Sequence, residues 1–186
     1  MIVADGLSVR GVYADVSLTA ETGALVAVAG PTGSGRTSVL LTLAGRMKPT
    51  SGTLAVGGHT RPGAIRRVAA LALVDGVTDF DRALTVREHL HERRRKPYQE
   101  VLKRTGLTVD AHTRVADLDR EQQVRLGLAL ALLDHPQVIV ADNVDAGLPV
   151  ERQAAVWGLL RNLDTTVVAS CVHPVGPADV IVELAA

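Results

Sequence analysis

The residues best suited to chemistry form one glycine-rich segment, residues 30–38. It reads Gly30-Pro31-Thr32-Gly33-Ser34-Gly35-Arg36-Thr37-Ser38. The segment meets the pattern G-x-x-x-x-G-K-[ST] at every position except the lysine, which is arginine here. Glycines let the backbone curl so that several N–H groups and a helix N-terminus face one anion. The spacing therefore predicts a phosphate-binding loop, in which Thr37 offers a hydroxyl to Mg²⁺ and Arg36 supplies the cation.

Hydrophobic segments flank this loop on both sides. The run Leu25-Val26-Ala27-Val28-Ala29 precedes it, and a helix-like stretch over residues 39–44 follows it. Strand, glycine loop and helix, in that order, are the context that separates a phosphate site from a glycine-rich surface turn. We therefore expect a nucleotide to bind here, whereas hydrolysis depends on residues elsewhere.

Short apolar segments alternate with helical ones along the chain. Strands are predicted at 16–18, 25–29, 53–56, 69–74, 138–141, 166–169 and 180–184. Helices are predicted at 36–44, 86–95, 98–105, 121–133 and 150–163, the last with Pro149 near its first turn. Several strands are unbroken Val, Ile and Ala runs, so the alternation predicts a layered α/β domain with parallel strands. Residues 76 to about 118 interrupt it as a polar helical insertion, whereas Gly57-Gly58 and Pro62-Gly63 mark turns only.

The composition predicts one domain with a core of small apolar side chains. The chain has 186 residues, of which 47% are hydrophobic but only 2% aromatic, so Ala, Val and Leu must fill the core. Its 20 Lys and Arg balance its 20 Asp and Glu, which argues against broad electrostatic binding of nucleic acid or anionic membranes. The single cysteine cannot form an internal disulfide, which fits a reducing cytosol. No apolar run approaches the ~18 residues needed to cross a bilayer, and no signal pattern opens the chain. A soluble, cytoplasmic protein is expected.

Several further segments resemble one family in their order and spacing. After the loop, residues 40–58 read as a helix that ends in a glycine, a P-x-x-G turn at Pro49–Gly52 and a strand. Residues 84–90 resemble the start of a helical subdomain, and residues 122–133 resemble the helix after a signature sequence. Residues 135–142 resemble the strand that ends in the Walker B aspartate, here Asp142. The chain thus resembles the ATP-binding cassette (ABC) ATPase family from about residue 7 to 184.

This resemblance implies an α/β P-loop NTPase fold, with one ABC-type nucleotide-binding domain over residues 1–186 and a small helical subdomain over approximately 76–134. It implies ATP and Mg²⁺ as cofactors, with ATP on residues 30–38 and Mg²⁺ on Thr37, Asp142 and, as a lesser ligand, Asp75. The alternative for Asp142 is a capping or turn aspartate. It also implies a second ABC-type subunit, in a homodimer or a heterodimer, and a separate membrane-spanning subunit that would hold the protein at the inner face of the cell membrane. No nucleic-acid partner is expected.

Several catalytic positions depart from the family pattern. Arg36 stands where lysine is expected; either the loop tolerates the longer planar fork, or the phosphate geometry changes. Asn143 occupies the position of the glutamate that polarises the attacking water. An amide cannot accept a proton at neutral pH, and loss of a general base typically costs ~10²–10⁴ in rate. Asp75 replaces a metal-sensing glutamine, and it either approaches Mg²⁺ or faces solvent after its strand.

The signature and the switch position differ as well. The signature, L-S-G-G-Q in the family, reads Leu118-Asp119-Arg120-Glu121-Gln122. Asp119 and Glu121 bring negative charge toward a partner's γ-phosphate, only partly offset by Arg120, so this face is not expected to clasp ATP in the usual way. The switch histidine position falls on Cys171, and His173 would replace it only if the strand end shifted; the alternative for His173 is a structural role.

Two features outside these motifs have open interpretations. Tyr13 is the N-terminal candidate to stack on adenine, although it is misplaced by about two residues. The charged run at residues 91–96 is either a solvated helix end or a docking surface for a membrane subunit.

Retained binding elements and altered catalytic positions together favour one function. We expect an ATP-binding subunit of an ABC transporter-like complex, which binds Mg·ATP and hydrolyses it weakly. The alternatives are an active ABC ATPase that energises transport through a separate membrane subunit, and a nucleotide-dependent regulatory or structural module. An ABC ATPase acting on nucleic acid is disfavoured by the zero net charge and the scarcity of aromatic residues.

Overall fold

Five parallel strands form the central sheet of this computed structural model, which describes residues 1–93, 97–174 and 176–185. The strand order is β5-β6-β7-β3-β8. The strands are β3 (Leu25–Ala29), β5 (Ala69–Leu71), β6 (Val138–Ala141), β7 (Thr166–Cys171) and β8 (Val180–Glu183). Because the strands are parallel, the segments after β3, β5, β6 and β7 all leave the sheet at the same edge.

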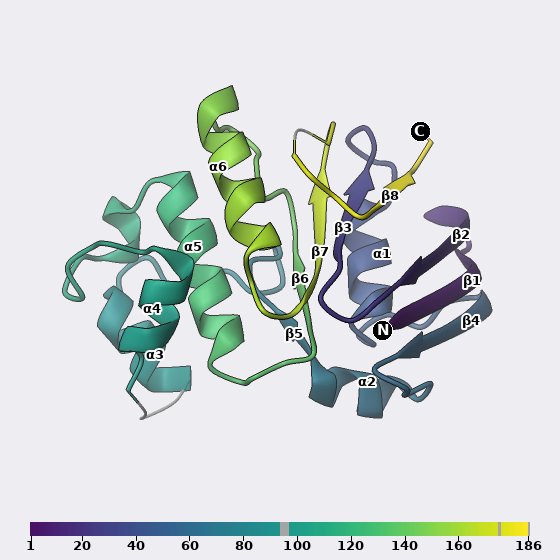
Figure 1. The fold of residues 1–186 in the computed structure, drawn as a ribbon, viewed down its shortest axis with the longest axis horizontal. Helices are drawn as coiled ribbons and strands as arrows, with labels where there is room; N and C mark the ends of the chain where they lie inside the picture. Colours follow the sequence, from purple (N-terminus) through teal and green to yellow (C-terminus); the bar gives the residue numbers. More distant parts are fainter. Residues whose placement is uncertain (94–96, 175, 186) are drawn as a thin grey trace.

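A second, antiparallel sheet of three strands lies beside the first, in the order β2-β1-β4. Its strands are β1 (Ile2–Val9), β2 (Tyr13–Ala20) and β4 (Ser51–Val56). Figure 1 shows the five-stranded sheet between this small sheet and a helical region drawn in teal and green. The layered α/β architecture predicted from the sequence is confirmed.

Six α-helices and one 3₁₀ helix complete the described residues. They are α1 (Arg36–Leu43), α2 (Pro62–Val68), α3 (Val86–Arg93), α4 (Gln99–Thr105), η1 (Val115–Asp117), α5 (Arg120–Leu132) and α6 (Val150–Arg161). Helices α3, α4 and α5 lie together in the helical region. No helix in the described ranges is both long enough and apolar enough to cross a membrane.

The structure corrects several local predictions. Residues 2–9 form β1, which the sequence analysis missed because polar and glycine residues interrupt the strand. Pro62 is the first residue of helix α2 rather than part of a turn, since proline is well tolerated where the helix leaves N–H groups unbonded. Strand β5 ends at Leu71, not at residue 74, so Asp75 does not directly follow a strand. Pro149 is the N-cap of α6. Residues 94–96 of the charged run lie outside the described residues.

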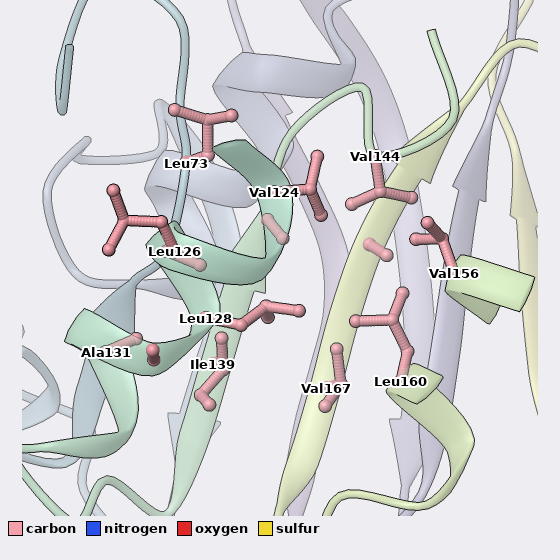
Figure 2. Close-up of a cluster of buried hydrophobic side chains, with 14 of the residues drawn as sticks. Leu73, Val124, Leu126, Leu128, Ala131, Ile139, Val144, Val156, Leu160 and Val167 are labelled. Atoms are coloured by element: carbon pink, nitrogen blue, oxygen red, sulfur yellow. The ribbon is translucent and has the colours of Figure 1, made fainter. Parts of the chain in front are cut away.

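Two hydrophobic clusters cover the two faces of the central sheet. Along β3, Leu25, Ala27 and Ala29 face one cluster, and Val26 and Val28 face the other. Figure 2 shows the first cluster, with Leu128 and Ile139 between α5 and β6, and Leu160 and Val167 between α6 and β7. Burial of each such side chain stabilises the fold by about 1.5–3 kcal/mol. Because both faces of the sheet are covered, its strands are unbroken apolar runs. The polar segments that follow the strands therefore meet at one edge of the sheet.

Candidate functional site

Glycines with positive φ shape the loop between β3 and α1. Gly33 and Gly35 both have a φ of +89°, which side-chain-bearing residues rarely adopt. Gly35 is the N-cap of α1, which has no side-chain cap and no acidic residue in its first turn. Pro31 and Thr32 are exposed at the tip. The first N–H groups of α1 therefore remain available to an anion.

Two buried polar atoms of this loop have no hydrogen-bond partner among the described residues. Arg36 is 8% exposed and Ser34 is 4% exposed. Neither Arg36 Nη1 nor Ser34 Oγ has a hydrogen-bond partner in the described part of the chain. Burying a charge without a partner is unfavourable. The loop thus holds a cation and a hydroxyl whose bonding needs an external anion would satisfy.

A chain of short hydrogen bonds joins α1 to the ends of β6 and β7. The Thr37 hydroxyl donates to Asp142 Oδ2 at 2.6 Å, and the Ser170 hydroxyl donates to Asp142 Oδ1. Asp142 is 1% exposed, and its carboxylate accepts both of these bonds. A threonine hydroxyl and a carboxylate are hard oxygen ligands of the kind that Mg²⁺ prefers. No cluster of three or more His, Cys, Asp or Glu suited to a metal occurs among the described residues.

Asn143 is held in an unusual backbone conformation beside this carboxylate. Its φ is +47°, and its N–H donates to Ser170 Oγ at 2.8 Å. Its carbonyl oxygen accepts a hydrogen bond from Arg120 Nη2 at 3.1 Å. Arg120 Nη1 also lies 3.7 Å from Asp75 Oδ1, on a side chain that is 56% exposed. The structure thus brings Asp75, Arg120 and Asn143 together, and Asp75 is both partly solvent-facing and paired with a cation.

The predicted signature forms the start of α5. Asp119 is its N-cap and makes a reciprocal capping box with Gln122, at 2.9 Å and 3.0 Å. Leu118 before it is buried. Arg120, which was expected to offset the two acids only partly, pairs with Asp75, and other arginines pair with the acids. Arg152 lies 2.8 Å from Asp119, and Arg125 lies 2.6 Å from Glu121.

The predicted switch positions differ in their surroundings. Cys171 is the last residue of β7 and is fully buried, and its carbonyl accepts a hydrogen bond from the Gly30 N–H at 3.3 Å. His173 is exposed two residues further on. Burial and the Asp145 charge raise the pKa of the Cys171 thiol to about 12, although the Arg36 charge lowers it.

Cys171 should be inert to thiol reagents in the folded protein. With a pKa of about 12, on the order of one thiol in 10⁴ is ionised at pH 8, and burial blocks access. Ellman's reagent should give no signal in native buffer over an hour and one full equivalent after unfolding in urea. Rapid reaction of the native protein would show that the end of β7 opens.

Tyr13 does not present its ring as an open stacking surface. It is 7% exposed, and its hydroxyl donates to Thr42 Oγ1 at 2.8 Å. A hollow of about 710 Å³ lies between the β1–β2 hairpin, Gly33, Ser34 and β8. It adjoins the phosphate loop and has the size of a small-molecule site.

Sequence reasoning did not single out three hydrogen-bonded residues around the ends of β6 and β7 and on α6. Ser170 bonds Asp142, Trp157 Nε1 donates to Asp145 Oδ2 at 3.1 Å, and Asp145 is buried with 7% exposure. A polar residue among apolar ones at a strand end could have marked Ser170. No local signal pairs Asp145 with Trp157, because that contact depends on how α6 packs.

Comparisons of the sequence and of the structure with known proteins point to the same family. The ABC transporter profile matches residues 13–146. The Nod factor export ATP-binding protein I of Rhizobium johnstonii is 31% identical over 160 residues, which span 80% of this chain and 51% of that protein. Thus the chain spans about half the length of that relative.

Two solved structures share the fold. CbiO1 of Clostridium perfringens, part of the ABC transporter complex CbiONQ, aligns with a TM-score of 0.76 and 17% identity, covering 92% of this chain and 78% of that one. The dimeric ATP-binding cassette MJ0796 bound to ADP and Pi aligns with a TM-score of 0.74 and 21% identity, covering 99% and 94%. The P-loop NTPase fold of the ABC type, expected from the sequence, is confirmed.

Proposed function

Because this chain belongs to the ABC transporter family of ATP-binding domains, we propose that it binds Mg·ATP in the loop of residues 30–38 and serves as the ATP-binding subunit of a membrane transport complex. The relative from Rhizobium is an ATP-binding protein of an export system, and CbiO1 is part of a transporter complex. In this role residues 1–186 form one ABC-type domain, with a helical subdomain over approximately 76–134.

The observation that carries this proposal is a buried guanidinium nitrogen of the loop that lacks a hydrogen-bond partner in the described ranges. Arg36 Nη1 has no hydrogen-bond partner in the described residues, and the start of α1 beside it has no side-chain cap. A triphosphate would satisfy both, because guanidinium groups and helix N-termini bind phosphate oxygens strongly. Gly33, Gly35 and Ser38 complete the same loop. The base and ribose would occupy the adjoining hollow of about 710 Å³.

Thr37 and Asp142 are the residues that would hold Mg²⁺. The Thr37 hydroxyl and the Asp142 carboxylate are hydrogen-bonded to each other at 2.6 Å. Both oxygens therefore already lie close enough together to bind one cation, which would take the place of this hydrogen bond. When bound, the ion neutralises phosphate charge. Asp75 is a weaker candidate because its oxygen lies 3.7 Å from Arg120.

We expect hydrolysis to be weak. Residue 143 follows the proposed metal ligand, and its asparagine amide cannot act as a general base. The signature supports the same conclusion, since Asp119 and Gln122 already bond the N–H groups at the start of α5 that a phosphate would need. A partner with an L-S-G-G-Q sequence would complete the site on this chain but would not replace the missing base. We therefore favour a heterodimer over a homodimer, with attachment to the membrane through a membrane-spanning subunit.

Calorimetry with Mg·ATP and Mg·ADP tests nucleotide binding. We expect both to bind the unmodified protein, and Arg36→Met to weaken binding by about 100-fold, because a charge-assisted contact to phosphate is lost. Arg67→Met is the matched control, since it removes an exposed arginine from α2. It should leave the affinity within two-fold. No heat with either nucleotide would contradict the proposal.

A further inference from the structure

A continuous chain of hydrogen bonds runs from the start of α5 to the start of α1. Arg120 Nη2 donates to the Asn143 carbonyl at 3.1 Å. The Asn143 N–H donates to Ser170 Oγ at 2.8 Å, and the Ser170 hydroxyl in turn donates to Asp142 Oδ1. The Thr37 hydroxyl donates to the other carboxylate oxygen of Asp142 at 2.6 Å. The altered signature is therefore connected, within one chain, to both residues proposed to hold Mg²⁺.

Asn143 has a backbone conformation that needs support from its surroundings. Its φ of +47° lies in the left-handed region, which residues other than glycine seldom adopt, although asparagine tolerates it better than most. Its N–H and its carbonyl are each bonded by a side chain of another element, Ser170 on β7 and Arg120 on α5. Such a residue persists only where the surrounding structure holds it in place. Arg120 supplies one of these two supports.

The position of Arg120 is itself fixed from two sides. Its Nη1 lies 3.7 Å from Asp75 Oδ1, and its side chain is 26% exposed. The preceding residue, Asp119, accepts hydrogen bonds from the Gln122 N–H at 2.9 Å and from Arg152 Nη1 on α6 at 2.8 Å. Of the two contacts that Arg120 makes, the bond to the Asn143 carbonyl contributes more, because a hydrogen bond from a charged donor outweighs a solvent-exposed ion pair.

We propose that Arg120 is a positioning residue for the magnesium site of its own chain. By bonding the Asn143 carbonyl, Arg120 keeps the Asn143 N–H on Ser170. Ser170 in turn holds the Asp142 carboxylate toward Thr37. Loss of one bond in such a chain weakens the others, because all of them depend on the same arrangement of groups. The effect on Mg²⁺ rests on the proposed function, whereas the connection from Arg120 to Asp142 does not.

Hydrogen exchange at the asparagine amides tests the connection without any ligand. Asn143 and Asn162 are the two asparagines of the sequence, so asparagine-selective isotope labelling gives one backbone amide signal for each. Arg120→Met should raise the exchange rate of the Asn143 N–H by about 10-fold, because the segment after β6 then opens more readily. The Asn162 N–H, which donates to the Leu159 carbonyl of α6, should keep its rate. Arg114→Met removes an exposed guanidinium beside η1; it is the matched control and should change neither rate.

Calorimetry of ATP with Mg²⁺ and with EDTA tests the effect on the metal. Arg120→Met should reduce the gain in ATP affinity that Mg²⁺ brings by about 10-fold, because groups that orient a metal ligand typically matter this much. Without Mg²⁺ the variant should bind ATP as tightly as the unmodified protein, since residues 30–38 are unchanged. A merely structural role for Arg120 would weaken ATP binding in both conditions.

Three results would overturn the proposal. They are an unchanged exchange rate at Asn143 in Arg120→Met, a parallel rise at Asn143 and Asn162 that reports a loss of global stability, and an unchanged gain from Mg²⁺ in a protein that binds ATP. Faster exchange at Asn143 alone, with no ATP binding in any variant, would support the connection and contradict the proposed function.

If Arg120→Met does not fold, Asp75→Asn decides instead, because it removes only the charge of a side chain that is 56% exposed. Faster exchange at Asn143 alone supports the proposal, and an unchanged rate overturns it. Asp164→Asn, at a side chain that is 95% exposed, is the charge-matched control and should leave both asparagine amides unchanged.

Discussion

Asn143→Glu combined with Arg36→Lys is expected to raise ATP turnover by about 10²-fold or more, since a positioned general base typically contributes 10²–10⁴. Residue 143 is fixed next to Asp142 by the Ser170 hydroxyl on its N–H and by Arg120 on its carbonyl. Its side chain therefore starts from a defined position beside the proposed metal ligand. Steady-state release of phosphate measures the effect.

Asn143→Gln with the same Arg36→Lys change is the matched control, because it adds the length of glutamate without a base. It should show no gain. Glutamate and glutamine both tolerate the φ of +47° less well than asparagine, so the unfolding free energy should fall by about 1 kcal/mol in both variants. Unmodified protein that hydrolyses ATP at ordinary enzyme rates of ~10 s⁻¹, with Asn143→Ala without effect, would contradict weak hydrolysis.

Gly35→Ala is expected to destabilise the protein by about 3 kcal/mol and to abolish nucleotide binding. A β-carbon at this residue would lie 2.7 Å from the Val12 carbonyl oxygen and 3.2 Å from Tyr13 Cβ. The β1–β2 hairpin and the phosphate loop would have to separate. Urea unfolding and calorimetry measure the two effects.

Gly33→Ala separates the contact from the backbone strain. Gly33 has the same φ of +89°, but a β-carbon there meets nothing within 4 Å. It should therefore cost only about 1 kcal/mol, the strain of a left-handed residue. Equal losses in the two variants would show that the hairpin does not support the loop.

Much of the fold could be predicted because local patterns and burial agree. The run at 25–29 became β3 and the run at 138–141 became β6 with the predicted bounds, since continuous Val, Ile and Ala suit strands covered on both faces. Strand β1 and helix α2 were missed because Gly6 interrupts one and Pro62-Gly63 opens the other. In both cases tertiary packing outweighed local propensity.

The sequence by itself predicted the glycine loop, the residue after Asp142 and the alternation of strands and helices, because each of these patterns lies within a few neighbouring positions. Only the tertiary structure decided which charges meet. Arg120 contacts Asp75 and the Asn143 carbonyl. The two acids of the signature form ion pairs with Arg152 and Arg125 instead. Asp145 came to lie buried and bonded to Trp157. The physical reason is that electrostatic partners are selected by distance in space, and the packing of α5 and α6 on the sheet sets those distances.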